Sequence, residues 1–269
     1  MLAKRMIVIV VLMPVFLLLN AAGGLAFTLL AMVVLGLAAW EYWRMFASGG
    51  HQPAAVVLIG GVLVMTAARY VGSFNISELM LCLLSMIAMA VHTIQYERGR
   101  EQAATDLVVT LAGLLYFGWL GPYVVSLRAL PGGLYWLLLV LITVWLVDIG
   151  GYVIGGWIGR LRIAPRTSPK KSWEGFLGGI VFSVLGGGLV ALLLGMVVPG
   201  LTFKSGALLG IVISLLSPLG DLGESMVKRQ FGFKDSSNLL PGHGGIWDRI
   251  DSWIWTWVIG YYMIVYFFL

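Results

Sequence analysis

The chain has 269 residues, of which 60% are hydrophobic and only 11% are charged, and its mean hydropathy is +0.97. A soluble domain of this size could not bury so much apolar surface in one core, so the composition excludes that class and leaves a polytopic membrane protein. The net charge of +5 is modest and indicates basic cytoplasmic loops rather than nucleic-acid binding. The single cysteine, Cys82, excludes an intrachain disulfide.

Apolar runs follow one another along the whole chain, and most have the roughly 20 residues that cross a bilayer as a helix. We therefore expect an all-α, polytopic integral membrane protein with about nine transmembrane helices. The first run could instead be a signal peptide, but a second apolar run follows at once and favours a helical hairpin. The runs cover residues 6–20, 25–45, 54–71, 78–94, 107–127 (broken by Gly121-Pro122), 134–158, 176–198, 206–227 and 246–269.

The positive-inside rule supports this count. With the N-terminus in the cytoplasm, all but three of the 17 lysines and arginines lie in cytoplasmic segments, the exceptions being Arg69, Arg128 and Lys204. The sequence thus predicts a multi-pass protein of the cell inner (plasma) membrane with a cytoplasmic N-terminus and a site that faces the cytoplasm.

Charge is distributed unevenly along the chain. The first five runs carry almost no charge within the membrane; His92 is the exception, and a lone histidine there is interpreted as a hydrogen-bonded packing residue. From Asp148 onward, charged residues occur within and beside the apolar runs. We expect a transmembrane scaffold over residues 1–100, a middle section over 101–133 and a catalytic transmembrane domain over 134–269.

The densest group of ionisable residues lies between Asp221 and Asp251. Charged groups beside hydrocarbon are costly and mark functional sites. Glu224 and Lys228 are spaced to pair along one helix, while Asp248 and Asp251 are three apart and share a helix face. The sequence predicts an active site here, at the cytoplasmic ends of two helices, and the stretch also holds Arg229, Lys234, Asp235, His243 and Arg249.

Two features precede this stretch. Asp148 stands between apolar neighbours and requires a partner, a cation or a metal. Gly151, Gly155 and Gly159 are four apart on one face, a spacing typical of closely packed helices.

The segment 160–173 is basic and is expected to be a loop. It is either a solvated loop of the positive-inside kind or a phosphate site, since lysines and hydroxyls before a helix N-terminus bind phosphate well. Its candidate ligands are Ser168, Lys170, Lys171 and Ser172; the spacing is not that of a P-loop.

Carboxylates on separate helices with cations between them suit a divalent metal and phosphate groups. This combination favours phosphoryl or nucleotidyl transfer, in which positioning and charge stabilisation do most of the catalysis.

The same residues resemble a known family. The pattern Ser225-x2-Lys228-Arg229-x4-Lys234-Asp235-x5-Pro241-x-His243-Gly244-Gly245-x2-Asp248-Arg249-x-Asp251 resembles the signature of the phosphatidate cytidylyltransferases, or CDP-diacylglycerol synthases. Residues 168–175 resemble the second motif of that family, with Ser172 where threonine is usual, and Asp148-x-Gly150-x-Tyr152 also fits. The resemblance covers about residues 134–269.

The resemblance implies the reaction of CTP with phosphatidic acid to give CDP-diacylglycerol and pyrophosphate, with Mg²⁺ and room for a second cation. It implies Asp221 and Asp248 as metal ligands, with Asp148 and Asp251 as second choices. Ser168, Lys170, Lys171 and Ser172 would bind CTP. The remaining expected site residues are Lys228, Arg229, His243 and Arg249. The partners are then the two substrates, the bilayer and a second copy of the chain in a homodimer, with no nucleic acid.

Two other functions compete with this one. A related CTP-dependent lipid kinase (polyprenol kinase-like) or another lipid cytidylyltransferase would share the metal site. An ion-coupled transporter also carries intramembrane acids, but it usually has paired helix breaks and polar groups near mid-membrane. Here the polar groups gather at the expected cytoplasmic ends in one half of the chain, which disfavours the transporter.

Overall fold

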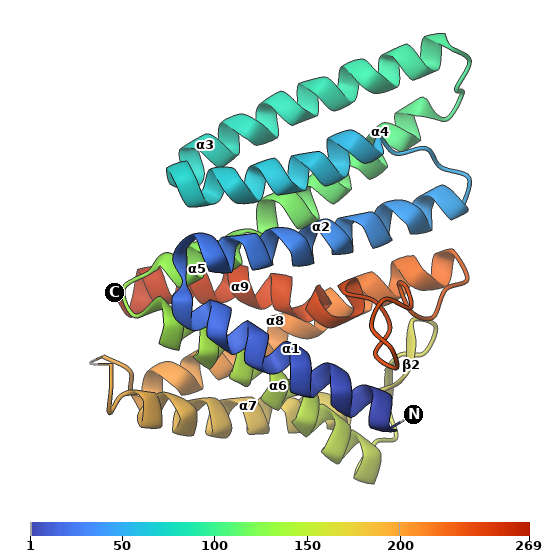
Figure 1. Cartoon of the computed structure of the whole chain (residues 1–269). Coiled ribbons are helices and arrows are strands. Elements are labelled where there is room, and N and C mark those ends of the chain that lie inside the picture. The colour runs from blue at the N-terminus through green and yellow to red at the C-terminus, as the bar shows by residue number, and fades with distance from the viewer. Residues whose placement is uncertain (1, 199) are drawn as a thin grey trace. The chain divides into compact units, whose positions relative to one another are not determined.

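The computed structural model describes residues 2–198 and 200–269, and these form nine α-helices, one π-helical segment and two short strands (Figure 1). The expected all-α class is confirmed. The chain divides into two compact units, Met1–Ala129 with Gln230–Ile250, and Leu130–Arg229 with Asp251–Leu269. The expected division into a scaffold over 1–100, a middle section over 101–133 and a catalytic domain over 134–269 is a functional one and stays a prediction.

The first unit begins with a tight helical hairpin, as expected. Two consecutive glycines, Gly23 and Gly24, have positive φ values of 64° and 49°, which side-chain-bearing residues rarely adopt. The turn lets the edge of Phe16 meet Phe27, with ring centroids 6.5 Å apart. The helices of this unit are α1 (Leu2–Ala22), α2 (Gly24–Ser48), α3 (Ala55–Glu97), α4 (Ala103–Gly113), η1 (Leu114–Leu120), α5 (Tyr123–Ala129) and the start of α9 (Trp247–Phe267).

The third and fourth expected runs are joined within α3, which folds back on itself (Figure 1). The two arms, Ala55–Gly72 and Phe74–Glu97, are each long and apolar enough to span a bilayer. They pack side by side, because a Cβ added at Gly61 would lie 3.1 Å from the side chain of Leu84. Near the bend, the Arg69 guanidinium donates to Ser77 Oγ at 3.1 Å.

The fifth run is interrupted where the sequence predicts it. The α-helix gives way to the π-helical segment η1, and the short helix α5 starts after Gly121-Pro122. Proline lacks the backbone donor that would continue the helical ladder, so a break is expected here. A Cβ at Gly121 would collide with the carbonyl of Phe117, which explains why glycine precedes the proline.

The expectation of almost no charge in the first five runs is wrong. Glu41, in the second run, has no exposed surface, and Arg69, in the third, is only 4% exposed. Asp106, just before the fifth run, is also fully buried. Each is accommodated by partners, as buried charges require; Asp106, for example, accepts from Arg100 Nε at 2.8 Å and from the Gln52 amide at 3.0 Å. The interpretation of His92 is confirmed, since its buried ring lies 2.9 Å from Thr110 Oγ1.

The second unit contains the close helix packing predicted from the glycine spacing. A Cβ at Gly150 would lie 2.6 Å from the carbonyl oxygen of Gly178, and one at Gly155 would lie 3.3 Å from the Cα of Gly175. The backbones of α6 and α7 thus nearly touch. The elements of this unit are α6 (Gly133–Ile158), β1 (Arg162–Ala164), β2 (Ser168–Ser172), α7 (Trp173–Leu194), α8 (Phe203–Gln230) and the rest of α9.

The expected loop over residues 160–173 is instead a small β-hairpin. Strands β1 and β2 pair antiparallel, with Arg162 opposite Ser172 and Ala164 opposite Ser168. The Arg162 guanidinium also donates to the carbonyl of Lys170 at 3.1 Å. Strand pairing satisfies backbone groups that would bond to water in a solvated loop. The basic residues therefore stand on an ordered support.

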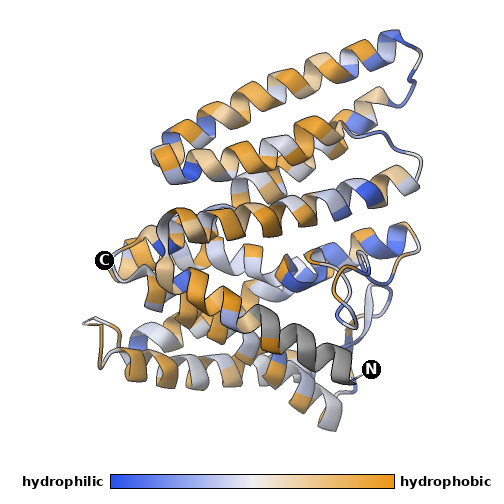
Figure 2. Ribbon diagram, viewed as in Figure 1, coloured by the Kyte–Doolittle hydropathy of each residue, from blue (hydrophilic) through white to orange (hydrophobic). Residues whose placement is uncertain are grey.

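Seven helical segments of the described residues are long and apolar enough to cross a membrane. Figure 2 shows hydrophobic residues along the helices, with hydrophilic residues concentrated toward helix ends and connecting loops. The chain is therefore a polytopic membrane protein. The seven include the arms of α3 and the combined segment Ala103–Ala129, whereas α1 contributes only the shorter apolar stretch Met13–Ala22. The count of nine spans and the cytoplasmic N-terminus stay predictions.

Candidate active site

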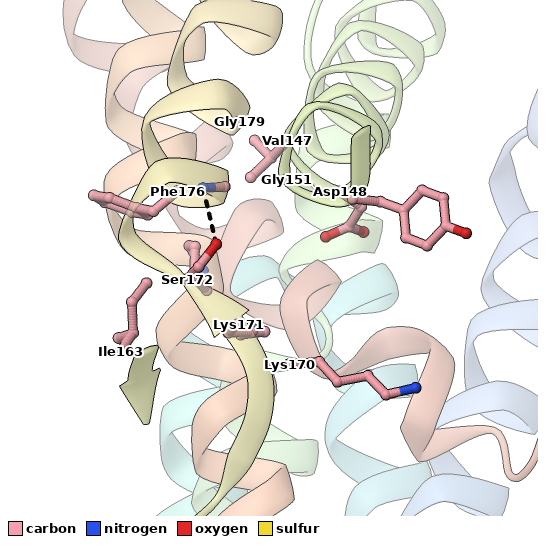
Figure 3. Close-up of a pocket in the computed structure, with 12 residues that line it drawn as sticks. Val147, Asp148, Gly151, Ile163, Lys170, Lys171, Ser172, Phe176 and Gly179 are labelled. Atoms are coloured by element: carbon pink, nitrogen blue, oxygen red, sulfur yellow. Dashed lines mark hydrogen bonds between the residues drawn. The ribbon is translucent and has the colours of Figure 1, made fainter. Parts of the chain in front are cut away.

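A cavity of about 220 Å³ in the second unit brings together several residues singled out in the sequence. Asp148 comes from α6, and Lys170, Lys171 and Ser172 come from β2 (Figure 3). Pro218 of α8 completes one side. Asp148 thus lines one cavity with two lysines and a hydroxyl that lie about 20 residues further along the sequence.

The last residue of β2 starts α7. Ser172 is 3% exposed, and its Oγ accepts a hydrogen bond from the Gly175 amide at 3.2 Å, a typical N-cap (Figure 3). Glu174 reaches back and accepts from the Leu161 amide at 3.2 Å. The cap explains why α7 starts at Trp173, three residues before the expected run. It also gives Ser172 a structural task in addition to its expected place in CTP binding.

Lys171 is directed at one of the predicted metal ligands. Its Nζ lies 2.5 Å from Asp221 Oδ2, and both side chains are about 30% exposed, at 29% and 32%. One turn further along α8, Ser225 Oγ donates to Asp221 Oδ1 at 3.2 Å. A phosphate-binding residue and a metal-binding residue of the sequence analysis are therefore neighbours, and Lys170 extends from the adjacent, exposed position.

Three carboxylates of the second unit converge. One oxygen each of Asp221, Glu224 and Asp251 lie within 4.8 Å of one another. Lys228, only 7% exposed, pairs with Glu224 at 2.5 Å, as its spacing predicted. Opposite ligands of an octahedral Mg²⁺ lie about 4 Å apart, since each bond is about 2.1 Å. The donor set and its spacing therefore fit a divalent cation with small side-chain adjustments.

The first unit holds the rest of the signature. Asp248, in the first turn of α9, uses Oδ2 to accept from the Ser236 amide (2.8 Å) and the Gly245 amide (2.7 Å), and this oxygen also lies 2.9 Å from Ser236 Oγ. Asp248 is thereby fixed in orientation by the loop that precedes α9. On the same helix, Asp251 follows three residues later, and it is 8% exposed.

The glycine-rich loop is also held by Arg249. Its Nε and Nη2 both donate to the carbonyl of His243, at 2.9 and 2.6 Å. Gly242 and Gly244 have φ values of 78° and 81°, so the loop needs glycine at these positions. Arg229, at the end of α8, is exposed. Phosphate-binding roles for His243, Arg249 and Arg229 stay predictions.

A second cavity, of about 520 Å³, lies in the first unit between the end of α2 and the loop after α8. Arg44 and Ser48 line one side, and Lys234, Asp235 and Asn238 line the other. Its polar lining was not anticipated from the sequence, in which Arg44 counted only as a cytoplasmic charge.

Sequence reasoning missed two acids. Glu224 was expected only as a partner of Lys228, yet its carboxylate also joins the acidic cluster. Glu41 lies fully buried in α2 and was not considered. A signal for it existed, because a glutamate inside an apolar run is costly enough to require a reason.

Comparison with known proteins connects this arrangement to a family. A sequence model described as "Cytidylyltransferase family" matches residues 3–267. The chain belongs to the cytidylyltransferase family. The match covers both halves of the chain, more than the 134–269 expected from the motifs. As a member of this family, the cytidylyltransferase is a membrane-embedded nucleotidyltransferase.

Individual relatives agree along nearly their whole length. The cytidylyltransferase is 37% identical to the phosphatidate cytidylyltransferase of Pseudomonas aeruginosa, covering 94% of this chain and 93% of the relative. It is 33% identical to that of a Synechocystis species, over 90% and 89% of the two chains. It is 30% identical to that of Bacillus subtilis, over 94% of both.

Proposed function

We propose that this cytidylyltransferase converts CTP and phosphatidic acid into CDP-diacylglycerol and pyrophosphate. The names of the similar proteins support this substrate pair. The structural observation that carries the proposal is the pairing of Lys171 with Asp221, because it joins a lysine-bearing pocket to a carboxylate cluster. Nucleotidyl transfer between two anions needs both elements: cations for the triphosphate and acids for a metal.

The chemistry follows from the charges of the reactants. An oxygen of the lipid phosphate attacks the α-phosphorus of CTP, and the bond from that phosphorus to the bridging oxygen of the β-phosphate breaks. Pyrophosphate leaves with the electron pair. Because the nucleophile is already an anion, the site needs no strong general base. It must neutralise charge between two anions and align them for in-line attack.

Residues of the second unit fit these tasks. Lys170 and Lys171 on β2 would bind the triphosphate, and the hairpin with its Ser172 cap holds them in place. Asp221, Glu224 and Asp251 would hold a divalent cation, for which Mg²⁺ suits the all-oxygen donors. When bound, such a cation neutralises phosphate charge and orients the leaving group. Lys228 balances Glu224 and keeps its carboxylate in position.

Other residues keep roles implied by the family motif. Asp248 and Asp148 would serve as further metal ligands. Ser168 would assist in binding CTP. The phosphates of either substrate would be contacted by Arg229, His243 and Arg249.

We place the enzyme in the cell inner (plasma) membrane, with the hairpin and the loop after α8 on the cytoplasmic side, where CTP is available. The distribution of lysine and arginine supports this orientation. A homodimer is part of the proposal, and cross-linking in native membranes followed by mass measurement tests it.

The decisive experiment is a product assay. Purified protein in detergent–phosphatidic acid micelles, given labelled CTP and Mg²⁺, should form CDP-diacylglycerol and one pyrophosphate for each lipid converted. Mass spectrometry of the lipid product distinguishes the alternatives, since a CTP-dependent kinase would yield a phosphorylated lipid and CDP. Absence of any cytidylylated lipid would refute the proposal.

A further inference from the structure

Glu41 accepts four hydrogen bonds from a segment about 200 residues further along the chain. Its carboxylate receives Ser236 Oγ at 2.9 Å, Ser237 Oγ at 2.5 Å, the Ile246 amide at 2.9 Å and the Trp247 amide at 2.7 Å. Both carboxylate oxygens are used, each for one hydroxyl and one amide. Glu41 has no exposed surface, so these four donors replace its hydration shell.

The two amides belong to the start of α9. The first N–H groups of a helix have no partner within the helix, and the helix dipole favours a negative charge beside them. The Glu41 carboxylate, carried by α2, accepts from these N–H groups and places a negative charge beside them. The helix α9 begins at Trp247. The first turn of α9 is therefore anchored by a side chain of another helix.

The same anchor reaches a signature acid through one hydroxyl. Ser236 Oγ lies 2.9 Å from Glu41 Oε2 and also 2.9 Å from Asp248 Oδ2, so the two carboxylates share its single hydroxyl proton. A Cβ added at Gly245 would collide with Ser236 Oγ and with the Glu41 carboxylate, so the glycine allows this close approach. The Gly245 amide itself donates to Asp248 at 2.7 Å. Glu41, Ser236 and Asp248 thus form one continuous network.

We propose that Glu41 is a positioning residue of the cytidylyl transfer: it fixes the loop 236–246 and the first turn of α9, and so orients Asp248. The inference rests on the proposed function for its kinetic part. Glu41 is placed to act on the acids rather than on the substrates, and its loss should lower turnover more than nucleotide binding.

The test variant is Glu41→Gln, which keeps the shape but turns an NH₂ group toward donors. Displacing reacting groups by about 1 Å can cost about a hundredfold in rate, so we expect kcat to fall by about tenfold to a hundredfold. KM for CTP should change less than about threefold, because β2 with Lys170 and Lys171 is untouched. Amide hydrogen exchange should accelerate in peptides covering 236–247 and stay unchanged in those covering α6 and α7.

Asp106→Asn is the matched control. Asp106 is also a fully buried acid of the first unit, held by Arg100 and the Gln52 amide, and its hydrogen bonds among the described residues do not involve the loop 236–246. Both variants should lower the thermal midpoint, since both perturb a buried charge network. Only Glu41→Gln should lower kcat and loosen the loop.

Ser237→Ala provides a second test that survives if Glu41→Gln does not fold. It removes one of the four donors, so kcat should fall by a smaller factor in the same direction. The double variant should be no slower than Glu41→Gln alone, because both changes break one network.

The outcomes separate the two proposals. Unchanged amide exchange over 236–247 in both Glu41→Gln and Ser237→Ala overturns the anchor. Faster exchange with an unchanged kcat overturns the positioning role. Both variants are compared with a wild-type protein that forms CDP-diacylglycerol. If the wild type forms none, the proposed function fails, and the exchange measurement still decides whether Glu41 holds the loop.

Discussion

At the scale of single residues, the candidate site is a set of opposite charges in mutual contact. Lys171 meets Asp221, and Lys228 meets Glu224, each at 2.5 Å. The two pairs differ in exposure: the first is partly open to solvent, whereas Glu224 and Lys228 are buried at 2% and 7%. The open pair can exchange its partners for ligands, while the buried pair serves to hold a carboxylate in place.

Asp221→Asn should separate catalysis from stability. The change removes a charge from the metal-binding cluster, and activity should fall by about a hundredfold or more, the scale of a lost electrostatic contact in a transition state. Its pair with Lys171 is partly exposed and worth at most about 1 kcal/mol, so the thermal midpoint should shift little.

Turnover and thermal midpoint are measured together, with and without Mg²⁺. Near-wild-type turnover would show that Asp221 is not a metal ligand. A large drop in midpoint in the absence of Mg²⁺ would instead make it a structural ion-pair partner. Asp248→Asn is measured in parallel, since Asp248 is the other acid that the motif assigns to the metal.

Lys170→Ala with Lys171→Ala should weaken nucleotide binding. Each charge-assisted hydrogen bond contributes about 1.5–3 kcal/mol, so the double variant should lose at least about tenfold in kcat/KM, chiefly by a higher KM for CTP. The hairpin should remain, because its pairing uses backbone groups. Steady-state kinetics over a range of CTP concentrations provide the measurement, and an unchanged value would leave the lysines as ordinary cytoplasmic charges.

At the scale of elements, the contact of α6 with α7 sets the geometry of the pocket. Glycines on both helices let the backbones approach, and this brings Asp148 of α6 into one pocket with the strand that precedes α7. A side chain at Gly150 or Gly178 would force the helices apart. The pocket therefore depends on residues that carry no chemistry themselves.

Gly150→Ala should expose this dependence. The added methyl would lie 2.6 Å from the carbonyl oxygen of Gly178 and against Phe182, and such overpacking typically costs about 1–3 kcal/mol. Gly156→Ala is the matched control on the same helix, where an added Cβ meets nothing within 4 Å. Thermal midpoints in one detergent should fall for the first variant and stay near wild type for the second. Equal midpoints would contradict the close contact.

At the scale of the whole molecule, the predicted orientation in the membrane would place the lysines and the acids on one side. The β-hairpin (β1–β2) and the loop after α8 are expected in the cytoplasm, and the segment around Lys204 is expected outside. These three positions follow from counting apolar runs, so a single miscounted span would reverse some of them.

Single cysteines test the orientation. In a background with Cys82→Ala, Arg166→Cys and Asn238→Cys should resist a membrane-impermeant thiol reagent in intact cells, and Lys204→Cys should react. All three positions are exposed on the protein, so resistance reports sidedness rather than burial. All three should react after permeabilisation. Labelling of Arg166→Cys or Asn238→Cys in intact cells would refute the nine-span topology.

The sequence by itself determined the membrane class, the approximate positions of the helices and most residues of the candidate site. Hydropathy and charge are properties of consecutive residues, so a run of apolar side chains predicts a span wherever the chain goes. The break at Gly121-Pro122 and the glycine-lined contact were likewise predictable, since each rests on local backbone chemistry. The signature acids could be named because their spacing is a local pattern.

Only the tertiary structure decided which charges from different elements meet. The pairing of Lys171 with Asp221, the entry of Glu224 into the acidic cluster and the anchoring of α9 by Glu41 join residues far apart in sequence. Spacing within one helix says nothing about such contacts. They are fixed by helix packing and by the need of each buried charge for partners, which can be met by any segment that the fold brings near.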